Sequence, residues 1–506
     1  MKHELIKFIE TNENFGHKCQ IFPDERMIDF IESSIGLDRM CRNATLHAIN
    51  IIHDKTYEMK TSGRTLELAQ RIAKHFKASG LTGPFGKASQ TNKLINAADK
   101  FIRMERNAGR YGLDQINDSG ITQALRALQD GFGRAFNPKL PLVKWPTSHS
   151  MHGRQSFSLQ FDGKTQIKYG EFIQFSLPRA RKNKQELKIS NVRWKDKPEN
   201  IGSKFTISRN SDGRYYVSFS TVDSIDVRVY DNINEIKQLH IGAIDLGLDE
   251  LFTDAHGNRA LNLEEFTQVQ QHKKDLLQWE SIHADEQRKL SLLKQVRKKT
   301  GSRRSNRQIK QQQRVNRIYQ KIVDVRRDYY RKVACVLAEH HDILITEDLS
   351  VKSMMSRKKS KRNTRKKFQR FALSDFMRIL VNKFKKEGKI LHQVGRYFAS
   401  SQTCSNCGAQ DRSSLITDKN KNKVHSCSNC CHVMDRDQNA ARNILFEGLS
   451  QPPSEKTHRH MWDAIKMNSK MLLDVNVSHR MIKYCSNDHF GVPARHDSTH
   501  HVCYPA

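Results

Sequence analysis

Apolar residues follow a helical pattern over the first quarter of the chain and an alternating pattern after it. After a short strand at 18–22 and a turn at Pro23, apolar positions three and four residues apart predict helices that continue, with interruptions, to about residue 130. From about residue 140 apolar and polar residues alternate, which predicts strands at 156–161, 188–194, 204–209 and 214–220. The last two flank Asn210–Gly213, whose residues favour a hairpin. The pattern therefore predicts a small β-barrel with a helical insertion near its start.

Beyond residue 240 strands alternate with long helices, which is typical of an α/β sheet domain. Strands are predicted at 240–245, 343–347 and 389–394, with a hairpin at His256–Gly257 after the first. A helix over 307–340 is predicted from one apolar stripe, formed by Ile318, Ile322, Val325, Tyr329, Val333 and Val336. Ser374 is predicted to cap a further helix, which Gly388 ends. Residues 449–506 are polar and histidine-rich without periodicity, and we expect them to be poorly ordered.

Three acidic residues stand where predicted strands end or where a helix begins. Asp245 and Glu347 each close a predicted strand, and Asp437 precedes a run of small residues that predicts a closely packed helix. Each has an ordinary alternative. Asp245 could be a turn residue, Glu347 with Asp348 could begin a helix, and Asp435 and Asp437 could cap the last helix. The occurrence of all three positions together favours a shared site.

Carboxylates gathered at the rim of a sheet suit the metal-dependent hydrolysis of a phosphodiester. This reaction needs an activated water and a stabilised leaving oxygen, and two Mg²⁺ ions roughly 3.5–4 Å apart supply both. Hard cations of this kind take carboxylate oxygens as ligands. Asp245, Glu347 and Asp437 are therefore the candidate catalytic residues and magnesium ligands, and the predicted chemistry is cleavage of nucleic acid.

Four of the ten cysteines have the spacing of a zinc ribbon. Cys404 and Cys407 are separated by two residues, as are Cys427 and Cys430, and nineteen residues lie between the pairs. This spacing suits one tetrahedral Zn²⁺ held by four thiolates. We expect a structural role for this zinc, because so short a segment cannot build a core of its own. The segment lies between the second and third acidic positions, so it is predicted to flank the cleft and contact nucleic acid.

The charge balance narrows the class of partners. The chain of 506 residues has 87 Lys and Arg against 54 Asp and Glu, a formal net charge of +33. Such an excess is expected of a protein that neutralises phosphates, although a ribosome-associated or membrane-surface protein is the alternative. The N-terminus lacks the apolar segment of a secretory signal, and no apolar run is long enough to span a bilayer. Outside the zinc-ribbon set the cysteines show no disulfide pattern, which fits a reducing cytoplasm.

Two basic segments are candidates for nucleic-acid contact. One is a predicted helix with Arg303, Arg304 and Arg307, and the other is the run 357–367, which has eight basic residues in eleven. The candidate side chains of the run are Lys358, Lys359, Lys361, Arg362 and Arg365. Either segment could instead be solvated surface without a specific contact, and the run could also be a nuclear address. Histidines and cysteines after residue 449 are too irregularly spaced to predict a second metal site.

Several short words along the chain together resemble the TnpB family of transposon-encoded RNA-guided nucleases, which are related to type V CRISPR effectors. IDLGLDELFTDAHG, ITEDLSVKSMM and DRDQNAARNIL resemble the three RuvC segments of the family. SSQTCSNCG resembles the entry to its zinc-binding insertion. Pro23, Arg39 with Asn43, and the words GRQSF and DGRYYVSF fit the N-terminal half of the family. The resemblance covers roughly residues 18–448 and departs from the family pattern at Cys431, where Gly is usual, and at Met434, where His is common.

The resemblance implies a fold and a division into domains. It implies an α/β RNase H-like (RuvC) nuclease domain with an inserted zinc ribbon, and an N-terminal WED-type β-barrel that carries a helical REC insertion. The expected domains are the barrel at 1–25 and 136–236, the REC insertion at 26–135, the RuvC domain at 237–400 and 432–448, the zinc ribbon for target nucleic acid at 401–431, and a C-terminal extension at 449–506.

Site residues and partners are also implied by the resemblance. Asp245, Glu347 and Asp437 match the metal ligands of the family, and the D-x-N-A-A word favours Asp437 over Asp435 as the third. The expected partners are a guide RNA transcribed from the transposon end and a double-stranded DNA target, chosen by base pairing and by a short adjacent motif. The expected cofactors are two Mg²⁺ ions and one Zn²⁺ ion. The expected location is the cytoplasm of a bacterium or archaeon, in association with the nucleoid.

The leading functional prediction is an RNA-guided, Mg²⁺-dependent DNA endonuclease of a transposable element. One RuvC site would cut both strands in sequence, since the chain has no second nuclease motif. A nuclease-inactive RNA-guided DNA-binding repressor is one alternative, against which the three intact acidic segments weigh. A DNA strand transferase, or transposase, is the other alternative. It shares the RNase H-like fold, and the zinc insertion inside the nuclease domain weighs against it.

Overall fold

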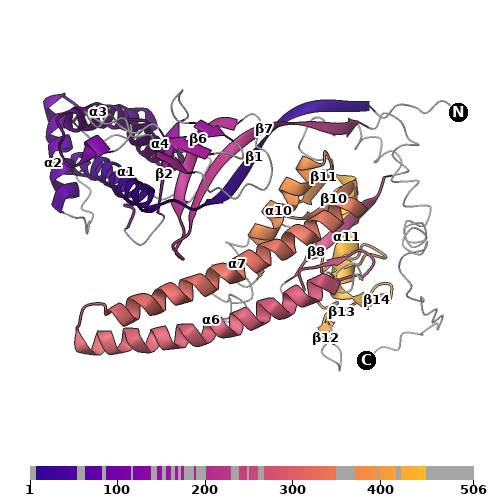
Figure 1. The fold of residues 1–506 in the computed structure, drawn as a ribbon. Coiled ribbons are helices and arrows are strands. Elements are labelled where there is room, and N and C mark those ends of the chain that lie inside the picture. The colour runs from indigo at the N-terminus through magenta and orange to yellow at the C-terminus, as the bar shows by residue number, and fades with distance from the viewer. Residues whose placement is uncertain are drawn as a thin grey trace. The chain divides into compact units, whose positions relative to one another are not determined.

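The computed structural model describes the chain as two compact units, which are treated separately below. The N-terminal unit comprises residues 12–223, and the C-terminal unit comprises residues 1–11 and 224–506 (Figure 1). The residues that the structure describes are 7–53, 63–82, 87–115, 118–137, 145–150, 155–160, 166–168, 172–175, 187–189, 201–229, 239–247, 250–259, 267–348, 371–395, 398–417 and 423–451. The predicted poor order of the C-terminal segment concerns residues that lie almost wholly outside this set.

Four helices pack around one core in the N-terminal unit. They are α1 (Glu25–Ile52), α2 (Gly63–Ala78), α3 (Ala88–Asn107) and α4 (Asp118–Ala135), with the short 3₁₀ helix η1 (Leu113–Gln115) before α4. The Asp24 side chain begins α1 by accepting a hydrogen bond from the Met27 backbone N–H at 2.8 Å. Leu68, Ile72 and Phe76 of α2 recur at helical spacing and are fully buried in this core. The helical pattern predicted up to about residue 130 is confirmed.

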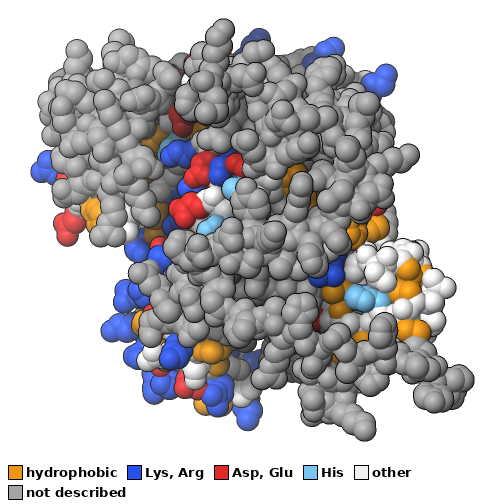
Figure 2. All heavy atoms as spheres, turned by 90° about the vertical axis from the view of Figure 1, so that its right-hand side faces the viewer, with side chains coloured by type: hydrophobic (Ala, Val, Ile, Leu, Met, Phe, Trp, Pro, Cys, Tyr) orange, Lys and Arg blue, Asp and Glu red, His pale blue; other side chains and the backbone are white. Residues whose placement is uncertain are grey.

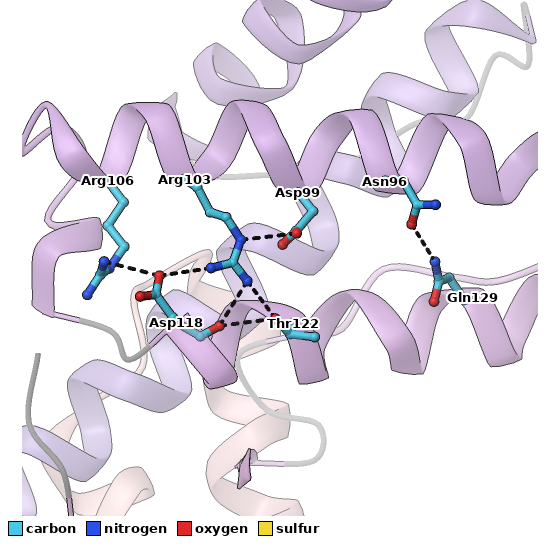
Figure 3. Close-up of polar contacts among 7 residues, drawn as sticks. All are labelled: Asn96, Asp99, Arg103, Arg106, Asp118, Thr122 and Gln129. Carbon is cyan, nitrogen blue, oxygen red and sulfur yellow. Dashed lines mark hydrogen bonds and ion pairs between the residues drawn. The ribbon is translucent and has the colours of Figure 1, made fainter. Parts of the chain in front are cut away.

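Charged side chains connect α3 to the start of α4 (Figure 3). Arg103 donates hydrogen bonds to Asp99 at 3.0 Å, to Asp118 at 3.0 Å and to Thr122 at 2.6 Å. Arg106 forms an ion pair with the same Asp118 carboxylate at 3.1 Å. Asp118 lies in the first turn of α4, where a negative charge also suits the helix dipole. These groups are partly exposed, so each contributes at most about 1 kcal/mol, and the contacts fix orientation more than stability.

The described strands between residues 7 and 229 form two hydrogen-bonded sheets. One sheet has the order β1 (Lys7–Ile21), β7 (Tyr215–Val229), β6 (Ile201–Arg209) and β2 (Gln155–Gln160). The other has β3 (Gln166–Lys168), β4 (Phe172–Phe175) and β5 (Leu187–Ile189). The predicted hairpin joins β6 to β7, with Gly213 at a φ of +90°. β1 is longer than the strand predicted at 18–22, and closure of the sheets into a barrel stays a prediction.

A mixed sheet of four strands lies at the centre of the C-terminal unit. Its order is β11 (Ile390–Val394), β10 (Ile343–Glu347), β8 (Ile241–Leu246) and β9 (Phe252–Asp254). β8, β10 and β11 run parallel, and β9 returns antiparallel to β8. The predicted α/β sheet and its three principal strands are confirmed. At the predicted hairpin position, His256–Gly257, the chain turns after β9 and bridges Thr253 to Arg259.

Different helices cover the two faces of this sheet, because successive strand residues point to opposite sides. Leu344 of β10 belongs to a core with α7 (Asn306–His340) and α10 (Leu373–Lys386). Its neighbours Ile343 and Ile345 belong to a second core with α11 (Arg436–Ser450). An added Cβ at Gly448 of α11 would lie 2.4 Å from Cγ2 of Ile345, so this helix approaches the sheet closely. Figure 1 shows these helices around β8, β10 and β11.

Two details of the predicted helices differ from the structure. On α7, Arg326 and Tyr330 are buried in place of Val325 and Tyr329, because the buried face of this part of the helix is centred one residue further along. Ser374 is not the N-cap of α10, since the helix begins one residue earlier and follows a residue without a side-chain cap. Asp375 anchors this helix start instead, through an ion pair with Arg327 of α7 at 3.2 Å.

The helix α6 (Thr267–Thr300) is a feature that the sequence pattern did not predict. It forms an antiparallel pair with α7, visible as a long helical hairpin in Figure 1. The buried Glu286 carboxylate of α6 accepts a hydrogen bond from Gln311 of α7 at 2.7 Å and pairs with Arg314 at 3.3 Å. Side chains of α6 are largely polar, so its apolar stripe is weak, and tertiary contacts with α7 decide its conformation. Within the described residues, no helix combines the length and the apolar character needed to cross a bilayer.

Replacing Gly388 with alanine is expected to lower the free energy of unfolding by about 2 kcal/mol or more. Gly388 ends α10 with a φ of +65°, where an L side chain costs roughly 1–2 kcal/mol, and an added Cβ would lie 2.2 Å from the Asp226 carbonyl oxygen. Chemical denaturation of the two proteins measures the difference. Gly395→Ala is the matched control, because no atom of the described residues lies within 4 Å of an added Cβ there and its φ is not positive. An equal loss of unfolding free energy in both variants would contradict a specific requirement for glycine at position 388.

Candidate active site and cysteine cluster

Asp245 and Glu347 lie side by side at one edge of the C-terminal sheet. Thr346 of β10 is paired with Ile244 of β8 in the parallel ladder, so the residues that follow them, Glu347 and Asp245, reach the same edge. In both strands the residues before the carboxylate are apolar and buried. Their burial fixes the register of the strands and hence the position of each carboxylate. The sheet therefore brings together two residues that are about a hundred positions apart in the chain.

Asp437 reaches the same edge from the first turn of α11. This helix contacts β8, β10 and β11, and its small buried residues Ala440 and Ala441 allow the close approach. Arg436 donates two hydrogen bonds to Oδ1 of Asp437, at 3.0 and 2.8 Å. Asp435 has a different position. It is the N-cap of α11 and accepts from the backbone N–H groups of Asp437 at 2.9 Å and Gln438 at 3.0 Å.

The charges of Glu347 and Asp437 act on the ionisation of Asp245. Burial, with smaller contributions from the negative charges of Glu347 and Asp437, raises the pKa of Asp245 to about 8, against the opposing effect of Arg436 and Lys423. Burial also raises the pKa of Glu347, while a hydrogen bond from Ser400 opposes the change. Three acidic groups that repel one another in a partly buried place form a site whose charge a divalent cation would balance. Carboxylate oxygens are the ligand type that Mg²⁺ takes, so these three residues are the ones that could hold it.

Ionic contacts surround the start of α11. The second oxygen of Asp435 forms an ion pair with Arg259 at 3.1 Å, which ties the N-cap to the turn after β9. Figure 2 shows a face of the molecule on which acidic, basic and histidine side chains lie side by side. One oxygen of Asp435 therefore caps the helix and the other pairs with Arg259. These contacts give Asp435 a structural role.

One loop and one helix connect this edge to the cysteine cluster. We name residues 400–405 the clamp loop. Ser400 at its start donates a hydrogen bond to Oε1 of Glu347. Asn439 and Asn443 of α11 are buried and bind the loop through its backbone, and Cys404 near its end belongs to the cluster.

The four predicted zinc ligands come together. The sulfur atoms of Cys404, Cys407, Cys427 and Cys430 all lie within 4.8 Å of one another. Cys404 and Cys430 are 3.7 Å apart at sulfur, and Cys407 and Cys427 are 3.6 Å apart. A zinc–sulfur distance of about 2.3 Å in a tetrahedron requires sulfur atoms roughly 3.8 Å apart. The cluster therefore has the size of a Zn(Cys)₄ site, and the residues fit this metal.

Both cysteine pairs sit on the same kind of turn. Each has the sequence Cys-Ser-Asn-Cys, and each Asn donates to a sulfur of the other pair, Asn406 to Cys430 and Asn429 to Cys407, both at 3.6 Å. A backbone hydrogen bond at Ala409 and the Asn429 amide lower the pKa of Cys407 to about 6, which favours the thiolate that zinc needs. These asparagines were not predicted, although the repeated four-residue word was a usable signal.

The residue after each pair has a left-handed backbone. Gly408 has a φ of 74°, and Cys431 at the equivalent place has a φ of 55°. This explains why Gly is usual at position 431 in the family that the sequence resembles, since an L side chain there costs roughly 1 kcal/mol. The short antiparallel strands β12 (Leu415–Thr417), β13 (Lys423–Ser426) and β14 (Val433–Asp435) complete the segment and lead directly into α11.

The predicted nucleic-acid contacts fall into two groups. Arg303, Arg304 and Arg307 lie exposed at the junction of α6 and α7. The basic run Lys358, Lys359, Lys361, Arg362 and Arg365 lies outside the described residues. The structure adds residues near the carboxylates that the sequence did not single out, namely Ser400, Lys423 and Arg436. Only Arg436 had a signal, its place between two aspartates, because the other two arrive through folding of distant segments.

Comparisons with known proteins point to one family. Residues 224–358 match the OrfB_IS605 family, described as "Probable transposase", and residues 374–444 match the family described as "Cas12f1-like, TNB domain". Together these two ranges contain the three carboxylates and the four clustered cysteines. The "Putative RNA-guided DNA endonuclease" of Streptomyces pristinaespiralis is 27% identical over 346 residues, which are 67% of this chain and 73% of the relative.

A second relative is the "TnpB-like protein L79" of Acanthamoeba polyphaga mimivirus, 26% identical over 251 residues, 49% of this chain and 44% of the relative. Among solved structures, the "Cryo-EM structure of the Cas12f1-sgRNA-target DNA complex" has 13% identity and a TM-score of 0.43, covering 86% of this chain and 99% of that chain. The family models and the named relatives agree with the predicted resemblance. The chain is thus similar to proteins of the TnpB family.

Proposed function

We propose that this protein is an RNA-guided DNA endonuclease of a transposable element, with Asp245, Glu347 and Asp437 as its catalytic carboxylates. The observation that carries the proposal is their convergence, which raises the pKa of Asp245 to about 8 through burial and through the charges of the other two. The relatives named as RNA-guided DNA endonucleases and as TnpB-like proteins support the same function.

The arrangement assigns a role to each side chain of the site. Bound Mg²⁺ would supply Lewis-acid chemistry and lower the pKa of a metal-bound water, which are the needs of phosphodiester hydrolysis. Ser400 holds Oε1 of Glu347, and Arg436 holds Oδ1 of Asp437, so we assign the other oxygen of each carboxylate to the metal. Lys423 and Arg436 favour the ionised form of Asp245, which is the form that binds a cation. One such site would cut the two DNA strands in sequence.

The nucleic-acid partners follow from charge and from the relatives. The net charge of +33 suits a protein that holds a guide RNA and a double-stranded DNA target together. Arg303, Arg304 and Arg307 are exposed and offer phosphate contacts at the α6–α7 junction. We propose that the guide is transcribed from the transposon end and that base pairing selects the target beside a short motif.

The proposed domain architecture extends the described fold. Sheet order β11-β10-β8-β9, with β9 antiparallel to the other strands, supports an RNase H-like nuclease domain with the zinc ribbon inserted before α11. The strands and helices of the N-terminal unit support a WED-type barrel with a helical REC insertion.

Cleavage of supercoiled plasmid is expected to depend on the cognate RNA. The protein purified with its RNA should linearise a plasmid that carries the matching target in Mg²⁺. The same protein stripped of RNA, and the complex given a plasmid with a scrambled target, should leave the plasmid intact. Gel analysis of the three reactions measures the effect. Equal cutting by RNA-free protein would exclude the guided mechanism while leaving the carboxylate site in place.

Strand transfer is the second candidate function, favoured by the description "Probable transposase" of the family that matches residues 224–358. Both functions use carboxylate-bound metal, so the products distinguish them. A hydrolase leaves free ends on the target, whereas a transferase joins a donor end to it. Sequencing the product ends with a labelled donor present decides between the two. Target binding without any cleavage would instead indicate a repressor.

A further inference from the structure

The clamp loop is fixed to α11 by two buried amides. Asn439 is fully buried, and its side chain donates to the Thr403 carbonyl at 2.7 Å and accepts from the Ser405 backbone N–H at 2.9 Å. Asn443 follows one helical turn later and donates to the carbonyls of Ser400 at 2.8 Å and Thr403 at 2.6 Å. Buried hydrogen bonds of this kind are costly to break, so the loop has one position relative to α11.

The same helix and loop hold three functional groups. α11 carries Asp437 in its first turn, the loop carries Ser400 at one end, and Cys404 lies near the other end. The Ser400 hydroxyl donates to Oε1 of Glu347, and Ser400 itself is buried. Any shift of the loop therefore moves the donor on Glu347 and a zinc ligand together.

We propose that Ser400 is a positioning residue that holds the Glu347 carboxylate in its metal-binding orientation, and that Asn443 and the cysteine cluster set the place of Ser400. The inference rests on the proposed function, because it presumes that Glu347 is a metal ligand. Three neighbouring carboxylates repel one another, so an unheld side chain turns away from the site before a cation arrives. A hydroxyl that fixes one carboxylate oxygen removes that freedom and presents the other oxygen. Groups that orient metal ligands in this way typically contribute 10–100-fold to metal affinity or activity.

The test measures metal binding directly, using Mn²⁺ as an EPR-visible probe titrated into the full-length protein with its RNA. Ser400→Ala is expected to weaken Mn²⁺ binding by about 10–100-fold, and Ser400→Thr, which keeps the hydroxyl, should restore it to within a few-fold. Ser414→Ala is the matched control, because Ser414 is also buried and its hydroxyl also donates a hydrogen bond, to the Asp411 carbonyl at 2.6 Å. Zinc content should stay at about one per chain in all three variants.

Asn443→Ala tests whether the loop acts through Ser400. It should weaken Mn²⁺ binding in the same direction, and the double variant Ser400→Ala/Asn443→Ala should be little weaker than Ser400→Ala alone. Additive losses would show that the amide does not work through Ser400, and this part of the inference would fall. Unchanged Mn²⁺ affinity in Ser400→Ala would overturn the positioning role itself. Asp245→Ala in the same titration separates this failure from that of the proposed function, because only a wrong carboxylate assignment leaves its Mn²⁺ binding intact.

Discussion

Replacing Asp245, Glu347 or Asp437 with alanine is expected to lower the rate of target cleavage by more than about 100-fold. Loss of a residue that only orients a metal ligand typically costs 10–100-fold, so loss of a ligand itself should cost more. The variants should still bind guide RNA and target, because the carboxylates repel phosphate and contribute nothing attractive to binding without metal. Single-turnover cleavage and a gel-shift assay on the same preparations measure the two quantities.

The thermal stability of Asp245→Ala shows whether a loss of cleavage comes from the site or from unfolding of the protein. The pKa of Asp245 is raised to about 8, above its unfolded value near 4, so this carboxyl lowers the free energy of unfolding increasingly as the pH rises from about 4 to about 8, and by the full amount above that. At pH 7, measured without added divalent metal, Asp245→Ala should therefore not lower the thermal unfolding midpoint. A marked fall in that midpoint would place Asp245 among the residues that hold the fold together.

Asparagine variants decide between the neighbouring aspartates of α11. Asp437→Asn removes a charge from the site and should lose cleavage. Asp435→Asn keeps an oxygen that can accept from the N–H groups of Asp437 and Gln438, so the helix cap survives and cleavage should fall only a few-fold. The reverse order of effects would make Asp435 the ligand.

Local pattern was sufficient for much of the C-terminal fold. The strands at 240–245 and 343–347 have continuous apolar residues because both faces of the sheet are covered, and such runs are visible in sequence. The predicted N-cap of α10 was wrong. Ser374 does not cap the helix, and its first turn is held by the ion pair between Asp375 and Arg327. The helix α6 was missed, since its polar side chains take their conformation from pairing with α7.

Some residues of the site could be predicted from the sequence and others could not. The carboxylates and cysteines were predicted because their chemistry depends on residue type and spacing. The structure brings the four cysteines together, and the shared site of the three carboxylates stays a prediction. Ser400 and Lys423 have no signal in sequence, because a serine and a lysine are common and their roles arise from the clamp loop and from β13. The sequence does not indicate which distant segment of the chain folds against Glu347.

Removal of the zinc is expected to abolish cleavage as well as to unfold the cysteine segment. Structural zinc in small modules contributes about 10–16 kcal/mol of binding free energy, comparable with the whole stability of a typical domain. Cys404→Ser combined with Cys427→Ser should reduce zinc from about one per chain to near zero, by elemental analysis. Proteolysis between residues 401 and 431 should then become rapid.

Cleavage should be lost in the same variant, because the clamp loop that holds Ser400 against Glu347 includes Cys404. Cys431→Gly is the matched control. Cys431 is disulfide-bonded and lies outside the set of four clustered sulfurs, and Gly suits the left-handed backbone at that position, so zinc content and cleavage should both be retained. Loss of zinc in Cys431→Gly would show that the zinc site depends on the Cys431 side chain and its disulfide. Full cleavage by a zinc-free protein would separate the cysteine segment from the catalytic site, because the clamp loop would then hold its place through Asn439 and Asn443 alone.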